Sequence, residues 1–434
     1  MSITLKIVKL TQKILSKFNR GGSMPGEIAL RLDKNFIQRF KMPEIVILIT
    51  GTNGKTSTSN MIAECLRANG LSVINNRKGD NINIGIATLL ATSSDNKFNI
   101  NADAAIIEVD ELTVYRQFKN LKPTHFVITN FFRDQLDRAG EMETIIRKIE
   151  EVVQDFSGHL IFNGDDPNTV RIGESAKNAT VHYYSVGEYS QSKKETDEAS
   201  EGKFCPLCGT PLVYDYYQYS HIGRFTCPND GFGKINSDIY VDAVNDKTFV
   251  AEGFEYHPIL DAIYNIYNCA AVLTVLKTMG LNYKEKADGV FSSFRVKEGR
   301  NEVFHFKKDC TLNLIKNPTG ANEVMKYILK DNAEKNVGII LNDNVPDGKD
   351  VSWIWDAHFE RLNVPSVKEI VCSGLRAYDM ALRLKYEGLE DKVVVKEDIK
   401  DLVKYLKESD TESHIMSTYT ALFKTRDILA KEQI

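Results

Sequence analysis

Residues 49–58, with the sequence ITGTNGKTST, constrain this chain more than any other stretch. An apolar run over residues 45–49 precedes the segment, and a helical pattern that ends near Gly70 follows it. The order is therefore strand, glycine loop, helix. Gly51 and Gly54 carry no side chains that would keep backbone N–H groups from phosphate oxygens at the helix N-terminus. The segment predicts a nucleoside triphosphate site.

Two side chains of this loop have specific roles in such a site. Lys55 supplies a positive charge to the β and γ phosphates of ATP, and the hydroxyl of Thr56 can bind Mg²⁺. Ile49 stands where the usual first glycine would be, so the loop is a short form. A glycine turn with an incidental lysine is the alternative. We expect the nucleotide to contact Gly51, Thr52, Asn53, Gly54, Lys55, Thr56 and Ser57.

The sequence GTNGKTST resembles the signature of the Mur ligase superfamily. Its members are ATP-dependent enzymes that join amines to carboxylates in cell-wall and folate synthesis. The resemblance implies a central ATP-binding domain followed by a C-terminal domain.

Length and charge set the broad class of the protein. The chain has 434 residues, of which 42% are hydrophobic and 26% are charged, as in soluble proteins of two or three domains. Its formal net charge of −4 gives no general reason to expect nucleic acid as a partner. Seven cysteines, three of them clustered, do not form a secreted disulfide pattern, and no signal peptide or long apolar span occurs. We expect a cytoplasmic protein.

The first twenty residues predict an amphipathic helix. Apolar side chains recur at helical spacing, at Ile7, Leu10, Ile14 and Phe18. Lysines form a basic face, at Lys6, Lys9, Lys13 and Lys17. The apolar side can dock on the rest of the domain with the lysines in solvent, which is the simpler account. Peripheral contact with an anionic membrane surface is the second possibility.

Beyond the loop, short apolar runs alternate with helical patterns. The runs lie at residues 71–74, 104–109, 125–129 and 160–162 and predict a parallel sheet wrapped by helices. In such sheets, ligands bind beyond the carboxyl ends of the strands. The polar residues that follow these runs are Glu108, Asp110, Glu111, Thr129, Asn130, Arg133, Asp134, Asp137, Asn163, Asp165 and Asp166.

These polar blocks resemble the corresponding Mur ligase blocks, which implies that Glu108 binds Mg²⁺. A carboxylate suits this hard cation. Gln135 stands where the superfamily usually has histidine, which puts a second metal site of the usual kind in doubt. For Asp134, Asp137, Asp165 and Asp166, capping and turn formation are an equally good account.

The pattern changes over residues 203–234 or so, where two cysteine turns occur. Cys205 and Cys208 form the first turn, and Cys227 and Asp230 form the second after eighteen intervening residues. Two such turns resemble a zinc ribbon with a Cys₃Asp site, in which the metal has a structural role because protein fills all four positions. His221 is a competing ligand. The alternative is a degenerate ribbon held by its aromatic residues, Tyr214, Tyr216, Tyr217, Tyr219 and Phe225. The polar segment 188–202 predicts a surface linker into this insertion.

The remaining residues complete a domain plan of three parts. A helix opens near Tyr264, and the resemblance matches Asn268 to an asparagine that contacts adenine; a merely polar helix position is the alternative. Gly299 and Arg300 resemble the hinge to the C-terminal domain, and Arg300 is a further expected nucleotide contact. We expect an N-terminal helical segment (1–42), a central ATP-binding α/β domain with the inserted ribbon (43–298), and a C-terminal Rossmann-like α/β domain (299–434). The last domain has strand candidates at 337–341, 369–372 and 392–395 and a helix at 398–407.

Three features together resemble one branch of the superfamily. The first two are the ribbon and the segment from Asn342 to Asp356 (NDNVPDGKDVSWIWD). The third is the short segment ahead of the phosphate loop, which has only about 43 residues where most Mur ligases hold a UDP-substrate domain. The branch is the MurT family, the synthetase subunits of lipid II isoglutaminyl synthase. The resemblance implies ATP-dependent amidation of the D-glutamate α-carboxylate of lipid II through an acyl phosphate.

Ammonia for this reaction would come from a partner. Four cysteines, Cys65, Cys269, Cys310 and Cys372, lie mostly in apolar patterns typical of buried packing, so no glutaminase is evident in the chain. The resemblance implies a glutaminase partner, GatD, whose Cys-His pair is completed by an acid of this chain. Asp350 is our first choice and Asp356 our second; both could instead be turn residues.

Two other functions compete with this interpretation. A ligase like folylpolyglutamate synthase would share the loop and the two-domain plan but would not need the ribbon. A non-enzymatic binding protein that grips RNA with its ribbon would show slow nucleotide turnover, and the acidic net charge disfavours it.

Overall fold

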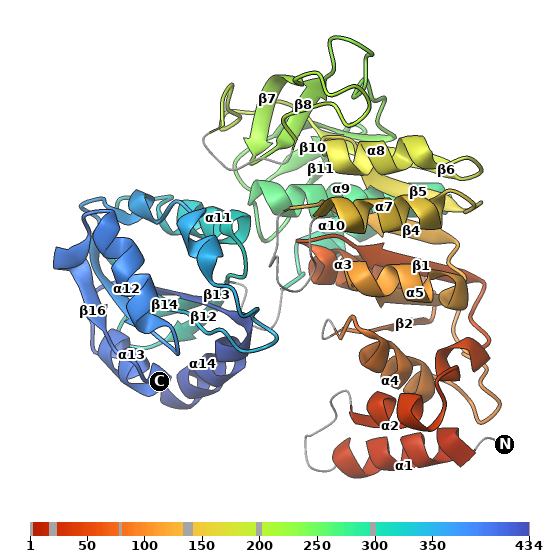
Figure 1. Cartoon of the computed structure of the whole chain (residues 1–434), viewed down its shortest axis with the longest axis horizontal. Helices are drawn as coiled ribbons and strands as arrows, with labels where there is room; N and C mark the ends of the chain where they lie inside the picture. Colours follow the sequence, from red (N-terminus) through yellow and green to blue (C-terminus); the bar gives the residue numbers. More distant parts are fainter. Residues whose placement is uncertain are drawn as a thin grey trace. The chain divides into compact units, whose positions relative to one another are not determined.

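The computed structural model describes residues 3–16, 24–77, 80–132, 142–196, 202–295 and 301–433 (Figure 1). The chain divides into two compact units. One contains the described residues as far as Phe132 and from 142 to Phe294, and the other begins at Arg295. The predicted domain boundary at residues 298 and 299 lies outside the described residues and stays a prediction.

A nine-stranded sheet forms the core of the N-terminal unit, in the order β11-β10-β9-β6-β5-β4-β1-β3-β2. Seven of its strands pair in parallel: β1 (Ile45–Thr50), β2 (Val73–Asn75), β3 (Ala104–Glu108), β4 (His125–Ile128), β5 (His159–Asn163), β6 (Thr180–Val186) and β9 (Ile239–Val244). The strands β10 (Phe249–Ala251) and β11 (Phe254–Tyr256) extend it as an antiparallel edge. Apolar runs in the sequence predicted β1 to β5, because strands buried on both faces are continuously apolar. The short antiparallel edge was not predicted.

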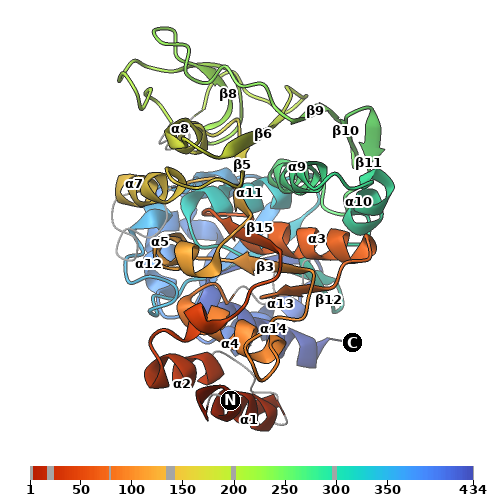
Figure 2. The same cartoon turned by 90° about the vertical axis from the view of Figure 1, so that its right-hand side faces the viewer.

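Helices cover both faces of this sheet (Figure 2). On one face lie α3 (Lys55–Ala68), α9 (Ile263–Thr278) and α10 (Lys284–Phe291), whose apolar residues join the main core. On the other face lie α5 (Glu111–Leu121), α7 (Met142–Val153) and α8 (Pro167–Ser175). Because β1 leads directly into the loop that starts α3, the sheet and α9 together fix the position of the phosphate loop.

Three helices and a short turn form the amino end of this unit. They are α1 (Ile3–Ser16), α2 (Met24–Leu32), η1 (Phe36–Arg39) and α4 (Asn83–Ser93), and α1 contacts α2 and α4 (Figure 1).

The helix α1 confirms the predicted helix but corrects the face on which it docks. Leu5 and Val8 are its buried side chains, whereas Ile7, Leu10 and Ile14 are exposed. The helix has two apolar faces, and tertiary packing covers the one that the periodicity analysis did not name. Lys17 and Phe18 lie outside the described residues.

The insertion between β6 and β9 contains an antiparallel hairpin of β7 (Val213–Tyr219) and β8 (Ile222–Thr226). Part of the predicted surface linker ahead of it pairs with the hairpin. Lys193 pairs with Tyr217 through both backbone hydrogen bonds, at 2.9 and 2.7 Å, so this part of the segment is tied to β7. Residues 197–201 of the linker are not among those described.

The C-terminal unit has a six-stranded sheet in the order β12-β13-β17-β14-β15-β16. The strands are β12 (Glu302–His305), β13 (Asp309–Leu314), β14 (Lys335–Ile340), β15 (Val367–Ser373), β16 (Val393–Val395) and β17 (Glu412–Ser417), and β12 is antiparallel to its neighbour while the others pair in parallel. The helices α11 (Pro318–Ile328) and α12 (Ala377–Tyr386) pack in one core cluster, while α13 (Ile399–Lys407) and α14 (Tyr419–Glu432) pack in another. Short turns lie at η2 (Ser352–Trp355), η3 (Phe359–Leu362) and η4 (Glu390–Lys392). The three predicted strands match β14, β15 and β16.

Candidate active site

The phosphate loop connects β1 to α3 through two glycine residues in left-handed conformations. Gly51 has φ of 122° and Gly54 has φ of 85°. A Cβ atom at Gly51 would lie 2.3 Å from Thr129 Oγ1, and one at Gly54 would lie 2.3 Å from Asn268 Oδ1. Gly51 therefore requires glycine for backbone conformation and for space, since Asn130 backbone atoms also lie 2.8 and 3.0 Å from that Cβ, whereas Gly54 requires it mainly for its positive φ.

The segment that follows β4 holds this loop in place. The backbone N–H of Thr52 donates to the Asn130 carbonyl at 2.8 Å, and that of Asn53 donates to Asn130 Oδ1 at 3.0 Å. Thr129 Oγ1 donates to the Asn53 carbonyl at 2.7 Å, and the N–H of Phe132 donates to Thr52 Oγ1 at 3.0 Å. These bonds brace the loop against the segment that follows β4. The sequence predicted Thr129 and Asn130 at this edge of the sheet, whereas their contacts with the loop depend on the tertiary structure.

Lys55 is buried at the start of α3 and is paired with an acid. Its Nζ donates to Glu111 Oε1 at 2.8 Å and to the Gly51 carbonyl. Burial lowers the pKa of Lys55, but the nearby carboxylates of Glu111, Glu108 and Asp110 outweigh it and hold the pKa above its ordinary value. Lys55 is therefore surrounded by carboxylates at the loop, with Glu111 as its ion-pair partner.

Glu108, at the end of β3, is the buried acid beside this lysine. Its side chain is 2% exposed; Oε1 accepts a hydrogen bond from Asn81 Nδ2 at 3.0 Å, whereas Oε2 has no hydrogen-bond partner among the described residues. Asn76 brackets the Glu108 backbone with two bonds of 2.8 Å. A buried carboxylate oxygen without a partner is costly and suits a hard cation. The hydroxyl-bearing Thr56 lies in the first turn of α3, half-buried.

The two asparagines that orient Glu108 were missed by the sequence analysis. They belong to the stretch from Asn75 to Asn83, which is unusually rich in asparagine and directly follows β2. That density of amides after a parallel strand was the signal that could have found them.

The acids after β5 have structural roles in this fold. Asp166 caps α8, since Oδ1 accepts from the Asn168 N–H at 2.9 Å, and its Oδ2 accepts from the Phe131 N–H at 2.8 Å. Asp165 is fully buried and accepts from Tyr267 OH at 2.6 Å and the Val186 N–H at 2.8 Å. Burial raises the pKa of Asp165 to about 6, against the opposing effect of these bonds. Asp166 therefore fits the capping alternative, whereas Asp165 ties α9 to the end of β6.

Other expected nucleotide contacts are placed only in part. Asn268 lies on α9, buried, with its amide against Gly54, so it supports the phosphate loop. Its expected contact with adenine stays a prediction. Ser57 is buried in the first turn of α3. Arg133, Asp134, Gln135, Asp137, Gly299 and Arg300 lie outside the described residues.

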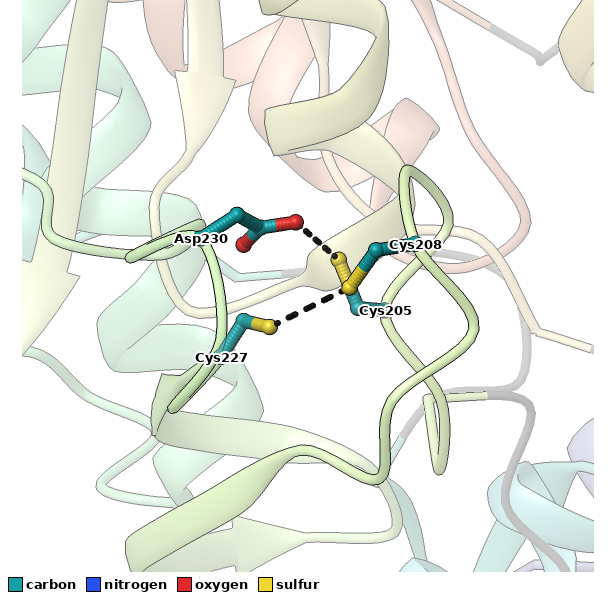
Figure 3. A group of neighbouring side chains, drawn as sticks. All are labelled: Cys205, Cys208, Cys227 and Asp230. Atoms are coloured by element: carbon teal, nitrogen blue, oxygen red, sulfur yellow. Dashed lines mark hydrogen bonds between the residues drawn. The ribbon is translucent and has the colours of Figure 1, made fainter.

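The hairpin insertion brings together the four predicted metal ligands (Figure 3). One ligand atom from each of Cys205, Cys208, Cys227 and Asp230 lies within 4.8 Å of the others. Cys208 Sγ is 3.6 Å from Cys227 Sγ, and Cys205 Sγ donates to Asp230 Oδ2 at 3.3 Å. Thiolates about 3.8 Å apart are what tetrahedral bonds of about 2.3 Å to zinc require. The donor set and its geometry therefore fit zinc.

The two turns that carry these ligands share one backbone design. The N–H of Gly209 donates to the Cys205 carbonyl at 2.9 Å, and that of Gly231 donates to the Cys227 carbonyl at 3.0 Å. Both glycines have positive φ, 75° and 78°. Two equivalent knuckles thus face each other across the cluster, as the CPLCG and CPNDG sequences predicted.

His221, the competing ligand, lies elsewhere. Its ring is buried 4.9 Å from the ring of Phe132, and Nε2 is 3.4 Å from Asp166 Oδ1. The structure therefore brings Asp230, and not His221, to the cysteine cluster.

In the C-terminal unit, the candidate acids lie in the loop between β14 and η2 and at the end of η2. Asp350 is partly buried, and Oδ1 accepts from the Ser352 N–H at 2.8 Å. Asp356 is exposed at the end of η2. The loop is anchored at its other end by buried Asp347, whose Oδ1 accepts from the Thr420 N–H at 2.7 Å. Burial raises the pKa of Asp347.

An exposed apolar stripe lies on α12, next to this loop. Tyr378, Leu382 and Tyr386 are spaced four residues apart and are all exposed, and Leu375 precedes them. Trp355 extends the stripe, with its ring 5.5 Å from that of Tyr386 and 5.3 Å from the Arg383 guanidinium. We call these five apolar residues the α12 stripe. Large apolar side chains grouped on one surface are typical of protein interfaces.

The short phosphate loop at the carboxyl end of a parallel sheet, with a buried lysine and acid beside it, defines a Mur-type ATP-dependent ligase. The Mur ligase middle domain family matches residues 49–229, and the MurT ligase C-terminal family matches residues 314–422. A pseudomurein peptide ligase type C from Methanothermus fervidus has a similar fold, with a TM-score of 0.69 at 20% identity over 91% of this chain and 80% of that chain.

Curated relatives specify the branch. The MurT subunit of lipid II isoglutaminyl synthase (glutamine-hydrolyzing) from Staphylococcus aureus strain COL is 34% identical over 91% of this chain and 89% of that protein. Its counterpart from Streptococcus pneumoniae is 32% identical over 97% of this chain and 95% of that protein. The chain belongs to the MurT family of Mur ligases.

Proposed function

We propose that this protein uses ATP to amidate the α-carboxylate of D-glutamate in the stem peptide of lipid II, giving D-isoglutamine. The observation that carries the proposal is the similarity to two MurT subunits over more than nine tenths of the chain, together with a phosphate loop that is already formed. A folate-type ligase would share the loop, but the similarity to MurT subunits extends through both units.

The reaction has two steps, and atoms balance in each. A carboxylate oxygen attacks the γ phosphorus of ATP, the bond to the β-phosphate oxygen breaks, and ADP leaves. Ammonia then attacks the acyl carbon, loses a proton, and expels inorganic phosphate. Phosphorylation is necessary because oxide is a prohibitively poor leaving group.

Residues of the loop stabilise the charge on the transferred phosphoryl group. Lys55 would exchange Glu111 for the β and γ phosphates, which the backbone N–H groups at the start of α3 receive. Thr56 and Glu108 would hold Mg²⁺, which supplies further neutralisation of phosphate charge when bound. The buried Oε2 of Glu108, which lacks a hydrogen-bond partner in the described part of the chain, supports this assignment. Gly51, Thr52, Asn53, Gly54, Ser57, Asn268 and Arg300 complete the proposed nucleotide site.

The hairpin insertion would hold structural zinc through Cys205, Cys208, Cys227 and Asp230. Their mutual distances and their two matching knuckles support a zinc ribbon. Because all four positions would be taken by protein, the metal would stabilise the insertion without touching substrate. We also propose the boundaries of the three-part plan, with the central domain at 43–298 and a Rossmann-like C-terminal domain at 299–434.

Ammonia would come from a glutaminase subunit, GatD, bound to the C-terminal unit. Free ammonia is scarce at neutral pH, and the cysteines outside the ribbon are buried. The α12 stripe offers an apolar surface beside the loop that contains Asp350. Docking there would let Asp350 orient a histidine of the partner, and Asp356 is the second choice.

The two half-reactions allow a direct test of this assignment. In the purified complex with lipid II and ATP, Asp350→Ala should lower glutamine-driven amidation by about 10³-fold or more. The reason is that the acid of a catalytic triad holds the histidine in the correct tautomer and stabilises its charged form. Amidation driven by an ammonium salt should continue. Asp356→Ala is the matched variant and should leave both activities near wild type.

Other outcomes would change the assignment in defined ways. Equal loss with glutamine and ammonium would move Asp350 to the synthetase site, and loss in Asp356→Ala alone would exchange the two acids. Failure of the wild-type complex to amidate lipid II with either nitrogen source would refute the proposed function.

A further inference from the structure

The helix α1 carries a second apolar face that nothing in the described part of the chain covers. Ile3, Ile7, Leu10 and Ile14 are 76%, 40%, 60% and 50% exposed. Steps of four, three and four residues place them along one side of the helix. We call these four residues the α1 stripe.

The opposite side of α1 attaches the helix to the N-terminal unit. Leu5 and Val8 are buried, and the helix contacts α2 and α4. Lys9 Nζ donates to the Ser94 carbonyl at the end of α4. The helix is thus fixed through one apolar face and presents the α1 stripe outward, an arrangement that costs solubility unless the stripe has a partner.

The charged side chains of α1 itself are all lysines. Residues 3–16 contain Lys6, Lys9 and Lys13 and no aspartate or glutamate, although the chain as a whole has a net charge of −4. Lys6 and Lys13 are exposed and lie at one border of the stripe. An apolar stripe with lysines at its border matches the acyl boundary and the anionic headgroups of a membrane surface.

The helix α1 is too short to cross a membrane. No helix in the described ranges has the length and apolar content for a membrane span, and α1 itself has 14 residues. The helix would lie in the plane of the surface.

We propose that the α1 stripe docks the protein on an anionic lipid surface. A second copy of the chain is a poorer occupant, because α1 has no carboxylate to pair with the lysines of another α1. The benefit of this docking rests on the proposed function, since an enzyme that acts on a lipid-linked substrate gains from being held at the membrane. Lipid binding itself needs neither ATP nor substrate.

The experiment measures binding of the full-length chain to vesicles without nucleotide or substrate. Wild type should sediment with vesicles of phosphatidylglycerol and phosphatidylcholine and bind pure phosphatidylcholine much more weakly. Leu10→Ser combined with Ile14→Ser should weaken binding by about tenfold or more, because two apolar side chains leave the acyl boundary. Lys6→Glu combined with Lys13→Glu should also weaken it by about tenfold or more.

Matched controls separate the α1 stripe from general surface effects. Ile259→Ser combined with Val303→Ser removes two exposed apolar side chains elsewhere, and Lys34→Glu combined with Lys177→Glu reverses two exposed lysines of the same unit. Both control proteins should bind as wild type does. Circular dichroism should show that every variant stays folded.

The proposal is overturned by any of three results. They are absence of binding by wild type, binding that the α1 variants do not change, and self-association of the chain that Leu10→Ser with Ile14→Ser abolishes. Failure here is distinguishable from failure of the proposed function. The α1 variants should still amidate a water-soluble stem-peptide fragment at the wild-type rate, whether or not the stripe binds lipid.

Discussion

The phosphate loop and the cysteine knuckles both turn on glycines with positive φ, yet different surroundings hold them. At Gly51 an added Cβ would meet Thr129 Oγ1 at 2.3 Å and Asn130 backbone atoms at 2.8 and 3.0 Å. At Gly209 it would meet nothing within 4 Å. The loop is shaped by packing from several elements of a large core, whereas the knuckle is shaped by its own backbone and its ligands.

The difference extends to the cores behind the two turns. The loop adjoins the main cluster of the nine-stranded sheet, which includes Ile47, Ile49 and most of α9. The knuckles adjoin a small cluster in which Cys205 and Cys227 are themselves members, beside Val170, Phe225 and Phe232. A region with so little apolar burial of its own would gain much of its stability from the metal proposed for it. The loop should therefore be independent of added ligand, and the ribbon should not.

The first prediction removes the chemistry of the loop and keeps its shape. Lys55→Ala should lower ATP-dependent amidation by about 10³-fold or more, because the cation that faces the γ phosphate is lost. The bonds from Asn130 and Thr129 remain and keep the loop in shape, although the loss of the buried pair with Glu111 lowers the free energy of unfolding. Phosphate release and D-isoglutamine formation measure the activity, with Lys34→Ala as the exposed control. Near wild-type turnover in Lys55→Ala would remove the basis of the proposed function.

The second prediction tests the crowding at the two glycines. Gly51→Ala should destabilise the N-terminal unit by about 3 kcal/mol or more, since it adds a clash with backbone atoms to an unfavourable φ. Gly209→Ala should cost about 1 kcal/mol, because its Cβ enters open space. Urea unfolding of both variants gives the comparison. Equal costs would mean that the loop is no more tightly packed than the knuckle.

The third prediction concerns metal removal. Cys208→Ser should lose bound zinc and lower the unfolding temperature by roughly 5 °C, as should treatment of wild type with a chelator. The chelator should then have no further effect on the variant.

Cys372→Ala, a buried cysteine far from the cluster in sequence, should change stability without changing zinc content. Asp230→Cys should bind zinc more tightly, because a fourth thiolate suits this metal. Metal-free wild type of unchanged stability would refute the zinc site.

The fourth prediction uses the buried acid that joins the two regions. Asp165 accepts from Tyr267 of α9, and its carbonyl accepts from the Gly223 N–H of β8 at 3.0 Å. Burial raises its pKa in the folded protein to about 6, above roughly 3.9 in the unfolded chain, so the folded state binds the extra proton between these values. Its contribution to stability is fully present below about pH 4 and is lost as the pH rises through about 6.

The variant Asp165→Asn should remove this pH dependence. Its amide oxygen can still accept from Tyr267 OH and Val186 N–H, and no charge is buried at high pH. Relative to wild type, it should gain roughly 2–3 kcal/mol between pH 4 and pH 8. The free energies of unfolding of wild type and variant, measured at pH 4 and pH 8, test this prediction. A difference between the two proteins that does not change with pH would show that Asp165 stays ionised in the folded protein.

Sequence patterns alone predicted the parts of this protein whose causes are local. The glycine loop with Lys55 and Thr56, the apolar strands β1 to β5, and the two CPxxG turns each contain their own signal within a few residues. The burial of Cys65, Cys269, Cys310 and Cys372 follows from the same short patterns, and capping was one of the two roles left open for Asp166. Local backbone preferences and apolar periodicity act over such distances, so the chain encodes them directly.

Only the tertiary structure decided which of several suitable residues meet. Asn81 reaches Glu108, Asn130 reaches the phosphate loop, and Asp230 rather than His221 joins the cysteines. Each pairing depends on how strands distant in sequence lie side by side, which no short pattern contains.

The helix α1 shows the same limit most clearly. Its sequence determined a helix with apolar residues on two sides, and either side could have docked. Packing against α2 and α4 buried Leu5 and Val8 and left Ile7, Leu10 and Ile14 in the open, because a helix at the edge of a domain has only one neighbouring surface to cover it.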